Sequence, residues 1–383
     1  MPSHPNAEAV PVLADAALSR APLAFHRSLP GYAATPLREL PALASRCGAA
    51  RVWLKDEGRR LGLPAFKVLG ASWAVCRTLA ERLGEPALAA DPAALRARLA
   101  GAPALVAATD GNHGRAVART AALLGLPARI FLPAGAAPAR LAAIAGEGAE
   151  VEEVDGSYDD AVERAATAAA VEGALLVQDT GWPAGPYGEP AYEDVPRRVS
   201  EGYSTLFWEC EEQLAAAGEG PPDLMIVPVG VGALAQTAVR FWKRPELAGR
   251  VRLAGVQPAG APCLLAALAA GAPVRLPGRQ DSLMAGLNCG TVSHVAWPWL
   301  RRGIDLVVTV EDERAEEGVR ALAAEGVVAG ETGAAGAAGL LELAATGELA
   351  AAAGRERPRI LLLSTEGATD PASWERIVGR RPD

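Results

Sequence analysis

The sequence contains few of the residues that build metal centres and disulfide frameworks. Of its 383 residues, 5 are cysteine and 4 are histidine. The cysteines are odd in number, widely scattered and free of the CxxC spacing of zinc sites, and the histidines show no metal-binding spacing. We therefore expect neither a bound structural metal nor a disulfide scaffold.

Long uninterrupted apolar stretches are also missing. Half of the residues are apolar, but glycine, proline or charged residues interrupt the apolar stretches, well before the roughly 18 residues that a membrane span needs. The N-terminal segment carries an acidic residue early and has no apolar stretch behind a basic start, unlike a secretory signal. These features predict a protein of the cytoplasm that does not enter a membrane.

Positive charge is scarce and dispersed. The net charge is −8, and no run of lysine and arginine is longer than a dipeptide. Proteins that bind nucleic acid usually carry a clustered basic surface. The sequence therefore predicts small molecules as partners and no nucleic acid.

Short apolar runs bounded by turn residues alternate with alanine-rich amphipathic stretches. Strand-like runs lie at 51–55, 104–109, 128–133, 150–154 and 174–179, with helix-like stretches at 70–83, 112–124, 137–147 and 158–172. The pattern resumes with runs at 223–229, 252–258, 305–310 and 359–365. This alternation predicts an α/β fold with two open, twisted, mostly parallel sheets covered by helices. A single hydrophobic core stops growing at roughly 250 to 300 residues. With 383 residues, the chain is therefore long enough for two domains.

Two segments interrupt this alternation. Residues 180–196 are dense in proline, glycine and aromatics, which indicates a crossover or lid, or else an ordinary surface loop. Its Trp182 and Tyr187 either wall a pocket or simply pack. Residues 85–103 resemble a helical insertion that starts at the N-cap Asp91, ahead of Pro92.

Residues near the starts of two predicted helices are candidates for catalysis. Lys67, in AFKVLG, follows an apolar residue and precedes a helix, where a lysine can form an imine with an aldehyde. The string GNHG at 111–114 opens the next helix and offers backbone donors to an anion. Asp110 before it is either an acid or base or the helix cap. His113 in the first turn is a packed residue or a site residue.

The segment PVGVGALAQ at 228–236 follows an apolar strand and precedes a helical stretch. Its glycines let backbone amides approach an anion, and the helix adds its positive end. The spacing differs from GxGxxG, so a dinucleotide is not expected. A single phosphate fits this segment, as does an ordinary tight turn.

Six separated motifs, in this order, resemble those of one enzyme family. They are FKVLGAS at 66–72, TDGNHGRAVA at 109–118, QDTGW at 178–182, VGVGALA at 229–235, MAGLNCGTVSHVAWP at 284–298 and STEGATDP at 364–371. Together they resemble the diaminopropionate ammonia-lyases, in the tryptophan-synthase-like group of pyridoxal phosphate enzymes known as fold type II. The resemblance implies that fold, pyridoxal 5'-phosphate as cofactor and a homodimer. It also implies a large cofactor-binding domain of residues 1–67 and 181–383 and a small mobile domain of residues 68–180.

Matched motif by motif, the resemblance implies a cofactor site. Lys67 holds the cofactor as an internal aldimine and shuttles protons, with Phe66 beside it, and Asn112 hydrogen-bonds the ring hydroxyl oxygen. Ser364 or Thr365 faces the pyridine nitrogen. Glu331 neighbours the ring or imine, or is an exposed acid that caps a helix. The amides that hold the phosphate are those of Gly230, Val231, Gly232, Ala233 and Leu234.

The resemblance also implies the reaction. By the resemblance, Lys67, Asp110 and Asp179 are the catalytic residues, and the substrate contacts come from Thr109, Asp110, His113 and Asp179. From its position at the end of a predicted strand alone, Asp179 could equally cap the following turn. Many relatives have serine at the position of Asp110, and a carboxylate there suits a diamino acid. The implied reaction is α,β-elimination of 2,3-diaminopropionate to pyruvate and ammonia through aminoacrylate.

Other outcomes stay open on the same motifs. A serine or threonine dehydratase or a β-replacement synthase would share every cofactor contact, and a catalytically idle cofactor-binding protein would share most of them. Cys263 and Cys289 fall in segments that lie near the cleft in the family, so they are either free thiols or a reversible disulfide.

Overall fold

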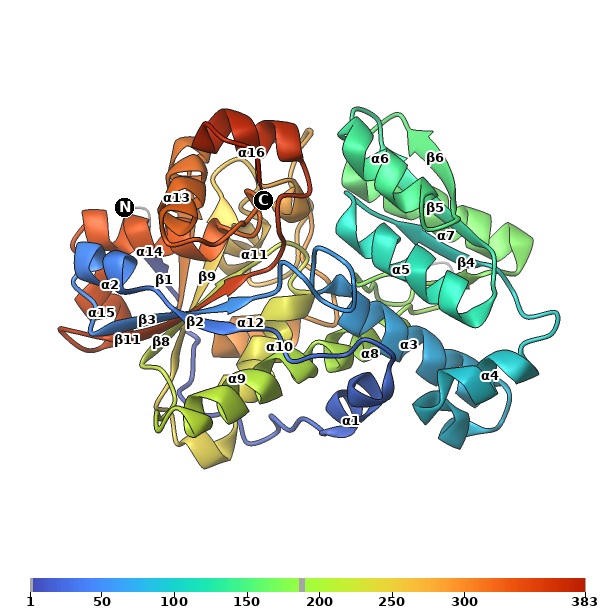
Figure 1. Cartoon of the computed structure of the whole chain (residues 1–383), viewed down its shortest axis with the longest axis horizontal. Helices are drawn as coiled ribbons and strands as arrows, with labels where there is room; N and C mark the ends of the chain where they lie inside the picture. Colours follow the sequence, from blue (N-terminus) through green and yellow to red (C-terminus); the bar gives the residue numbers. More distant parts are fainter. Residues whose placement is uncertain (1–2, 186–189, 383) are drawn as a thin grey trace. The chain divides into compact units, whose positions relative to one another are not determined.

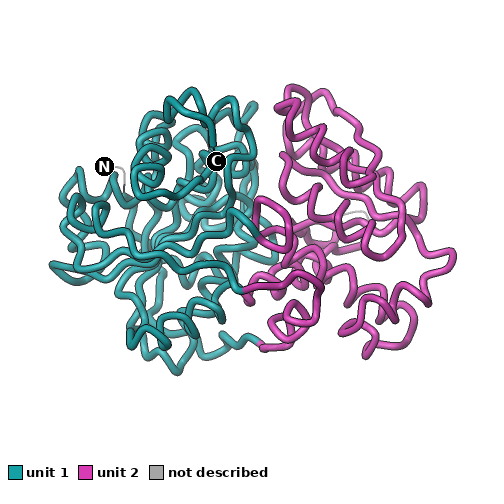
Figure 2. The backbone as a smooth tube through the Cα atoms, viewed as in Figure 1, with its two compact units in different colours: residues 1–18, 34–59, 206–383 teal, residues 19–33, 60–205 magenta. Residues whose placement is uncertain are grey.

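The computed structural model describes residues 3–185 and 190–382 (Figure 1). By its contacts the chain forms two compact units (Figure 2): residues 1–18, 34–59 and 206–383 make up the first, and residues 19–33 and 60–205 the second. The boundaries that the sequence resemblance implies for the large cofactor-binding domain and the small mobile domain, at 67/68 and 180/181, stay a prediction.

The first unit contains a seven-stranded sheet with the order β1-β10-β9-β8-β11-β3-β2. Its five inner strands are parallel, and only β1 and β2 at the two edges run antiparallel to their neighbours. The strands are β1 (Ser3–Pro5), β2 (Leu37–Glu39), β3 (Arg51–Asp56), β8 (Leu224–Pro228), β9 (Arg252–Pro258), β10 (Leu306–Val310) and β11 (Arg359–Ser364).

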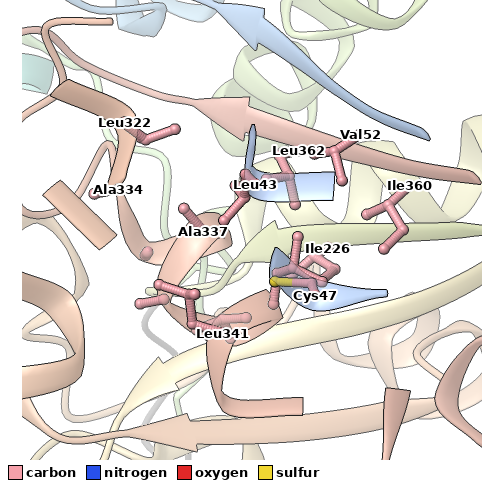
Figure 3. Packing of buried hydrophobic residues seen from close by; sticks show 14 of the residues in the cluster. Leu43, Cys47, Val52, Ile226, Leu322, Ala334, Ala337, Leu341, Ile360 and Leu362 are labelled. Carbon is pink, nitrogen blue, oxygen red and sulfur yellow. The ribbon is translucent and has the colours of Figure 1, made fainter. Parts of the chain in front are cut away.

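The core of the first unit forms because both faces of this sheet are covered. Ile226, Ile360 and Leu362 lie on one face, since alternate residues of a strand point the same way. Helices α2 (Pro41–Cys47), α13 (Asp312–Ala324) and α14 (Ala335–Ala345) pack on that face (Figure 3). The intervening Leu361 and Leu363 are equally buried on the other face, which explains why these strands are continuous apolar runs.

The second unit contains a four-stranded parallel sheet with the order β6-β5-β4-β7. Its strands are β4 (Leu105–Ala108), β5 (Ala128–Pro133), β6 (Glu150–Val154) and β7 (Leu175–Leu176). Helices α3 (Lys67–Arg82), α5 (Asn112–Leu124), α6 (Pro138–Ala145) and α7 (Tyr158–Glu172) alternate with them. These elements confirm the predicted α/β fold and its mostly parallel sheets. The run at 51–55, which the alternation groups with these strands, instead forms β3 beside β11 in the first unit.

Smaller segments complete the two units. Asp91 caps α4 (Pro92–Arg98) as predicted, because its carboxylate accepts hydrogen bonds from Ala93 N at 3.1 Å and Ala94 N at 3.0 Å. In the 180–196 segment, the Trp182 ring stacks on that of Tyr192, whereas Tyr187 lies outside the described residues. The remaining α-helices are α1 (Ala21–Ser28), α8 (Asp194–Gly202), α9 (Ser204–Ala216), α10 (Ala233–Trp242), α11 (Cys263–Ala270), α12 (Trp297–Gly303), α15 (Leu349–Ala353) and α16 (Pro371–Val378), and the 3₁₀ turns are Pro86–Ala90, Pro245–Leu247 and Ala285–Leu287.

Within the described ranges, no helix is both long enough and apolar enough to cross a membrane. The same residues contain no group of three or more histidine, cysteine, aspartate or glutamate side chains that could hold a metal ion.

Candidate active site

Lys67 is the first residue of α3 and forms an ion pair with Asp179. Its Nζ donates to Asp179 Oδ2 at 2.5 Å. The Lys67 side chain keeps 22% of its surface exposed, whereas that of Asp179 keeps 4%. Burial disfavours the ammonium, but the Asp179 carboxylate outweighs this effect and raises the pKa of Lys67 above its ordinary value. Burial likewise disfavours the Asp179 carboxylate, but the effect of the Lys67 ammonium is larger and lowers the pKa of Asp179 to about 2.

Asp179 and Asp110 come from neighbouring strand ends. Strand β7 pairs in parallel with β4, so the carboxyl ends of both strands lie at the same edge of the sheet. Asp110 follows β4 after one residue, and Asp179 follows β7 after two. Carboxyl ends of parallel strands line binding sites in open α/β sheets. The sheet thus presents two carboxylates at one edge of the second unit.

Thr109 organises the loop that carries Asp110. Its Oγ1 accepts hydrogen bonds from Gly111 N at 2.8 Å and Gly114 N at 3.0 Å, which closes the first turn of α5. Gly111 has φ of 152°, a region that residues with a Cβ rarely adopt. A Cβ on Gly114 would lie 2.4 Å from Thr109 Cγ2. Thr109 and not Asp110 therefore supplies the side-chain acceptor at this helix start, and the interpretation of Asp110 as the cap is wrong.

The Asp110 carboxyl is half-buried, close to two cations. Burial raises its pKa above the ordinary value, while Lys67 and Arg140 pull in the opposite direction. Arg140, from α6, lies beside the loop, because a Cβ placed on Gly111 would meet its Cδ at 3.0 Å. Arg140 lies in none of the six sequence motifs, so no local pattern connects it with this loop. Asp110 is thus easier to protonate than an ordinary aspartate, whereas Asp179 is harder.

Asn112 and His113 open α5. Asn112 is half-buried at the first helical position, and His113 is buried at the second. The Nε2 of His113 lies 2.8 Å from the carbonyl oxygen of Val177, which places the ring proton on Nε2. Among the described residues, no hydrogen-bond partner meets its Nδ1. Burial lowers the pKa of His113, so the ring is neutral and serves to fasten α5 to the segment that leads to Asp179.

In the first unit, the segment after β8 presents unoccupied backbone donors. Gly232, with φ of 98°, precedes α10, and no side chain caps this helix. Within the described part of the chain, no hydrogen bond occupies the amide N–H of Ala233 or Leu234. A Cβ on Gly232 would lie 2.6 Å from Leu300 Cδ1, so this position requires glycine. Adjacent free N–H groups at a helix start suit a phosphate.

Two cysteines adjoin this segment. The Sγ of Cys263 donates to the carbonyl oxygen of Gly230 at 3.4 Å. A Cβ on Gly230 would lie 3.1 Å from Cys289 Sγ. Both side chains are buried thiols.

Ser364, Thr365 and Glu331 gather at the same edge of the seven-stranded sheet. Strand β11 ends at Ser364 next to the end of β8, and the two strands are parallel (Figure 1). Ser364 Oγ donates to the carbonyl oxygen of Glu366 at 3.3 Å, and Thr365 Oγ1 donates to that of Thr332, also at 3.3 Å. The segment 330–333 packs on this turn, since Gly330 N donates to the carbonyl oxygen of Glu366 at 3.3 Å.

Glu331 is 4% exposed and accepts a hydrogen bond from Ser373 Oγ. The interpretation of Glu331 as an exposed acid that caps a helix is therefore wrong. The helix after it, α14, starts at Ala335 without a side-chain cap.

Tyr203 is a neighbour of Lys67 that the sequence motifs miss. It directly follows α8 and is fully buried. Its ring centroid lies 4.7 Å from that of Phe66, and Lys67 Nζ lies 5.9 Å from it. The string around it, EGYSTLF, matches no motif, and its distance from Lys67 along the chain offers no local signal.

Comparison with known proteins agrees with this arrangement. A family described as pyridoxal-phosphate-dependent enzymes matches residues 29–363. A diaminopropionate ammonia-lyase of Salmonella typhimurium is 36% identical over 93% of this chain and 90% of its own length. The Escherichia coli K12 enzyme of that name is 32% identical over 97% and 94%.

Solved structures lead to the same group. The crystal structure of the Escherichia coli lyase in complex with an aminoacrylate-PLP azomethine intermediate has a TM-score of 0.87 and 29% identity, and covers 98% of this chain and 96% of that one. Its complex with D-serine has a TM-score of 0.89 at the same identity and coverage. The predicted resemblance and fold type II architecture are confirmed. This chain belongs to the family of pyridoxal-phosphate-dependent enzymes, with the diaminopropionate ammonia-lyases among its relatives.

Proposed function

We propose that this protein is a diaminopropionate ammonia-lyase. It converts 2,3-diaminopropionate into ammonia and aminoacrylate, and water then converts aminoacrylate into pyruvate and a second ammonia. The observation that carries the proposal is the pair of carboxylates, Asp110 and Asp179, that interact with the single amine of Lys67. A substrate with two ammonium groups needs more negative charge than an ordinary amino acid does.

The residues that would hold pyridoxal 5'-phosphate are present in a form that fits it. Lys67 supplies the amine for the covalent link, with Phe66 and Asn112 beside it in the second unit. In the first unit, the free amides of the segment 230–234 suit the phosphate, and Ser364 or Thr365 suits the pyridine nitrogen. Glu331 is the acidic residue that would lie next to the cofactor ring or its imine. When bound, the cofactor withdraws electrons from the substrate Cα and so makes its proton removable.

The two carboxylates divide the work because their pKa values differ. Asp179, with its pKa lowered to about 2, stays ionised and pairs with the Lys67 ammonium or holds a substrate ammonium. Asp110, whose pKa burial raises, is the better proton carrier. An amine leaves Cβ readily only when it is protonated. Asp110 is therefore assigned to take the proton from Cα or to give one to the leaving amine, and Lys67 to do the complementary transfer.

The substrate side of the site is assigned to four residues of the second unit. Thr109 fixes the loop, and Asp110 and Asp179 bind the cationic groups. His113 anchors the helix start, and its buried Nδ1 remains as an acceptor for a substrate N–H.

Assays with both enantiomers of diaminopropionate test the proposal. We expect Lys67→Ala to abolish pyruvate release and Asp110→Asn to slow one enantiomer by about 100-fold or more, the range of general acid–base catalysis. Pyruvate and ammonia are measured together, and two ammonia are expected for each pyruvate. Unaltered turnover by both variants would contradict the assignment.

Serine is the matched competing substrate, because it differs only in expelling hydroxide from Cβ. A higher kcat/KM for serine or threonine than for diaminopropionate would make the protein a dehydratase. No turnover of any amino acid, with the cofactor bound, would make it an idle cofactor-binding protein.

The assembly and location that we propose are a homodimer in the cytoplasm, as the sequence resemblance implies. We also keep residues 68–180 as a small mobile domain and residues 1–67 with 181–383 as the cofactor-binding domain. Light scattering of the purified holoenzyme gives the number of subunits, and a monomer at working concentration would contradict the dimer.

A further inference from the structure

Two glycines bring α8 against the first turn of α3. A Cβ on Gly70 would lie 2.5 Å from Tyr203 Cε1 and 2.7 Å from Val199 Cγ1. A Cβ on Gly202 would lie 2.4 Å from the carbonyl oxygen of Leu69 and 2.8 Å from Gly70 Cα. Both glycines lie in regular helix, so close approach rather than backbone freedom explains them. Their contact sets the position of the residue that follows α8, which is Tyr203.

This contact places the Tyr203 ring beside the reactive amine. Lys67 Nζ lies 5.5 Å from the centroid of the Phe66 ring and 5.9 Å from that of the Tyr203 ring. The two rings are themselves 4.7 Å apart. The amine is therefore close to two aromatic rings and in contact with the Asp179 carboxylate.

The hydroxyl of Tyr203 has no hydrogen-bond partner among the described residues, although the side chain is fully buried. Buried hydroxyl groups in proteins nearly always have a partner, and one without a partner calls for an explanation. Burial also raises the pKa of Tyr203, and it outweighs the nearby Lys67 ammonium, which lowers that pKa, so the phenol keeps its proton. A neutral O–H that can donate is thus held next to Lys67.

The partner that fits is the neutral form of Lys67. As an ammonium, Lys67 has only donors and directs one of them to Asp179. As a free amine, it has a nitrogen lone pair that can accept a hydrogen bond. We infer that Tyr203 is a positioning residue that donates its hydroxyl hydrogen to the neutral Lys67 amine and holds that amine ready to accept a proton.

The inference rests on the proposed function in that Lys67 carries protons there, but its first test does not need the reaction. The test measures how fast an acylating reagent labels Lys67 in the cofactor-free full chain, as a function of pH, by peptide mass mapping. A donor to the neutral amine lowers the amine pKa, so its removal raises that pKa. In Tyr203→Phe we expect the midpoint of labelling to rise by about one pH unit, the effect of one hydrogen bond.

Tyr158→Phe is the matched control, because it removes a phenol hydroxyl from the start of α7 in the same unit. We expect its labelling midpoint to equal that of the wild type. Circular dichroism shows whether each variant is folded. If Tyr203→Phe does not fold, Gly202→Ala, which displaces the ring and keeps the hydroxyl, replaces it in the same measurement.

Kinetics of the holoenzyme complete the test. We expect Tyr203→Phe to lower kcat about tenfold and to leave KM for diaminopropionate unchanged, as for a group that acts on Lys67 and not on the substrate. An unchanged or lower labelling midpoint would overturn the inference, whatever the activity. A raised KM with an unchanged labelling midpoint would also overturn the inference. It would indicate that the Tyr203 hydroxyl binds the substrate and not Lys67. If the wild type lacks lyase activity while the midpoint shifts as expected, the proposed function fails and the position of Tyr203 stands.

Discussion

Burial and ion pairing have opposite effects on the pKa of Asp179, and the effect of the ion pair is the larger. Burial raises the pKa of this carboxyl, but the Lys67 ammonium lowers it from 3.8 to about 2. A pKa below that of the unfolded chain means that the folded protein prefers the ionised form. The pair therefore contributes its full stability above about pH 4 and loses it as the pH falls through about 2. The contribution is of the order of 2 kcal/mol.

We predict that Asp179→Asn removes this part of the acid sensitivity, because asparagine does not titrate. The measurement is the midpoint of thermal unfolding of the cofactor-free protein between about pH 5 and about pH 2. The midpoint of the variant is expected to fall less than that of the wild type over this range. Lys67→Met is the companion variant, since it removes the ammonium that keeps the Asp179 pKa low. Equal falls in all three proteins would show that the pair contributes nothing.

Single residues differ in how far the sequence alone identifies them. Lys67 and Asp110 stand in short motifs whose residue types suggest their chemistry. The contact between Lys67 and Asp179 joins positions 112 residues apart, and only the resemblance, not the local pattern, connects them. Tyr203 has neither a motif nor a charge, so only the packing of α8 on α3 reveals it.

At the scale of helices and strands, the sequence patterns predicted the parallel strands of both sheets and missed the two antiparallel edge strands of the seven-stranded sheet. Most of the parallel strands are four to seven largely buried residues, but β7 has only two, and β6, with the sequence EVEEV, has no fully buried residue. Strands β1 (Ser3–Pro5) and β2 (Leu37–Glu39) carry the residues SHP and LRE, which have no apolar alternation. Their pairing depends on the neighbours β10 and β3. Similarly, the run at 51–55 joins the other sheet because strand partners are set by distant contacts.

The contact between helices α3 and α8 yields a prediction about stability. Gly202→Ala would force a methyl group to within 2.4 Å of a backbone oxygen that has little room to move. We expect this variant to lose about 1 to 3 kcal/mol, the usual cost of overpacking, despite the better helix propensity of alanine. Gly220→Ala is the control, since its Cβ would meet only Arg359 Nη1, at 3.7 Å. The urea concentration at half-unfolding measures both, and similar values for the two variants would contradict tight packing at Gly202.

At the scale of the whole molecule, the proposed cofactor residues are distributed over distant parts of the chain. In the proposal, residues 66, 67 and 112 would supply the covalent link and the ring contacts, and residues beyond 229 would supply the phosphate and pyridine contacts. The order of the six motifs along the chain was therefore sufficient to predict the family. It could not predict which strand ends meet, because that follows from the sheet orders, which differ from the order along the chain.

Cofactor binding should stabilise the whole protein through the segment after β8. Pyridoxal phosphate at about 100 times its Kd adds about 2.7 kcal/mol to the free energy of unfolding. Gly232→Ala places a methyl 2.6 Å from Leu300 Cδ1 at a residue with φ of 98°, which distorts the amides that suit the phosphate. Gly326→Ala is the matched control, because Gly326 also has a positive φ, 75°, but its Cβ would meet nothing within 4 Å. Both variants should unfold at lower temperature without cofactor, since alanine is strained at positive φ. The increase in thermal midpoint on adding pyridoxal phosphate should persist in Gly326→Ala and be smaller in Gly232→Ala. Equal increases in the two variants would show that the segment after β8 does not bind the cofactor.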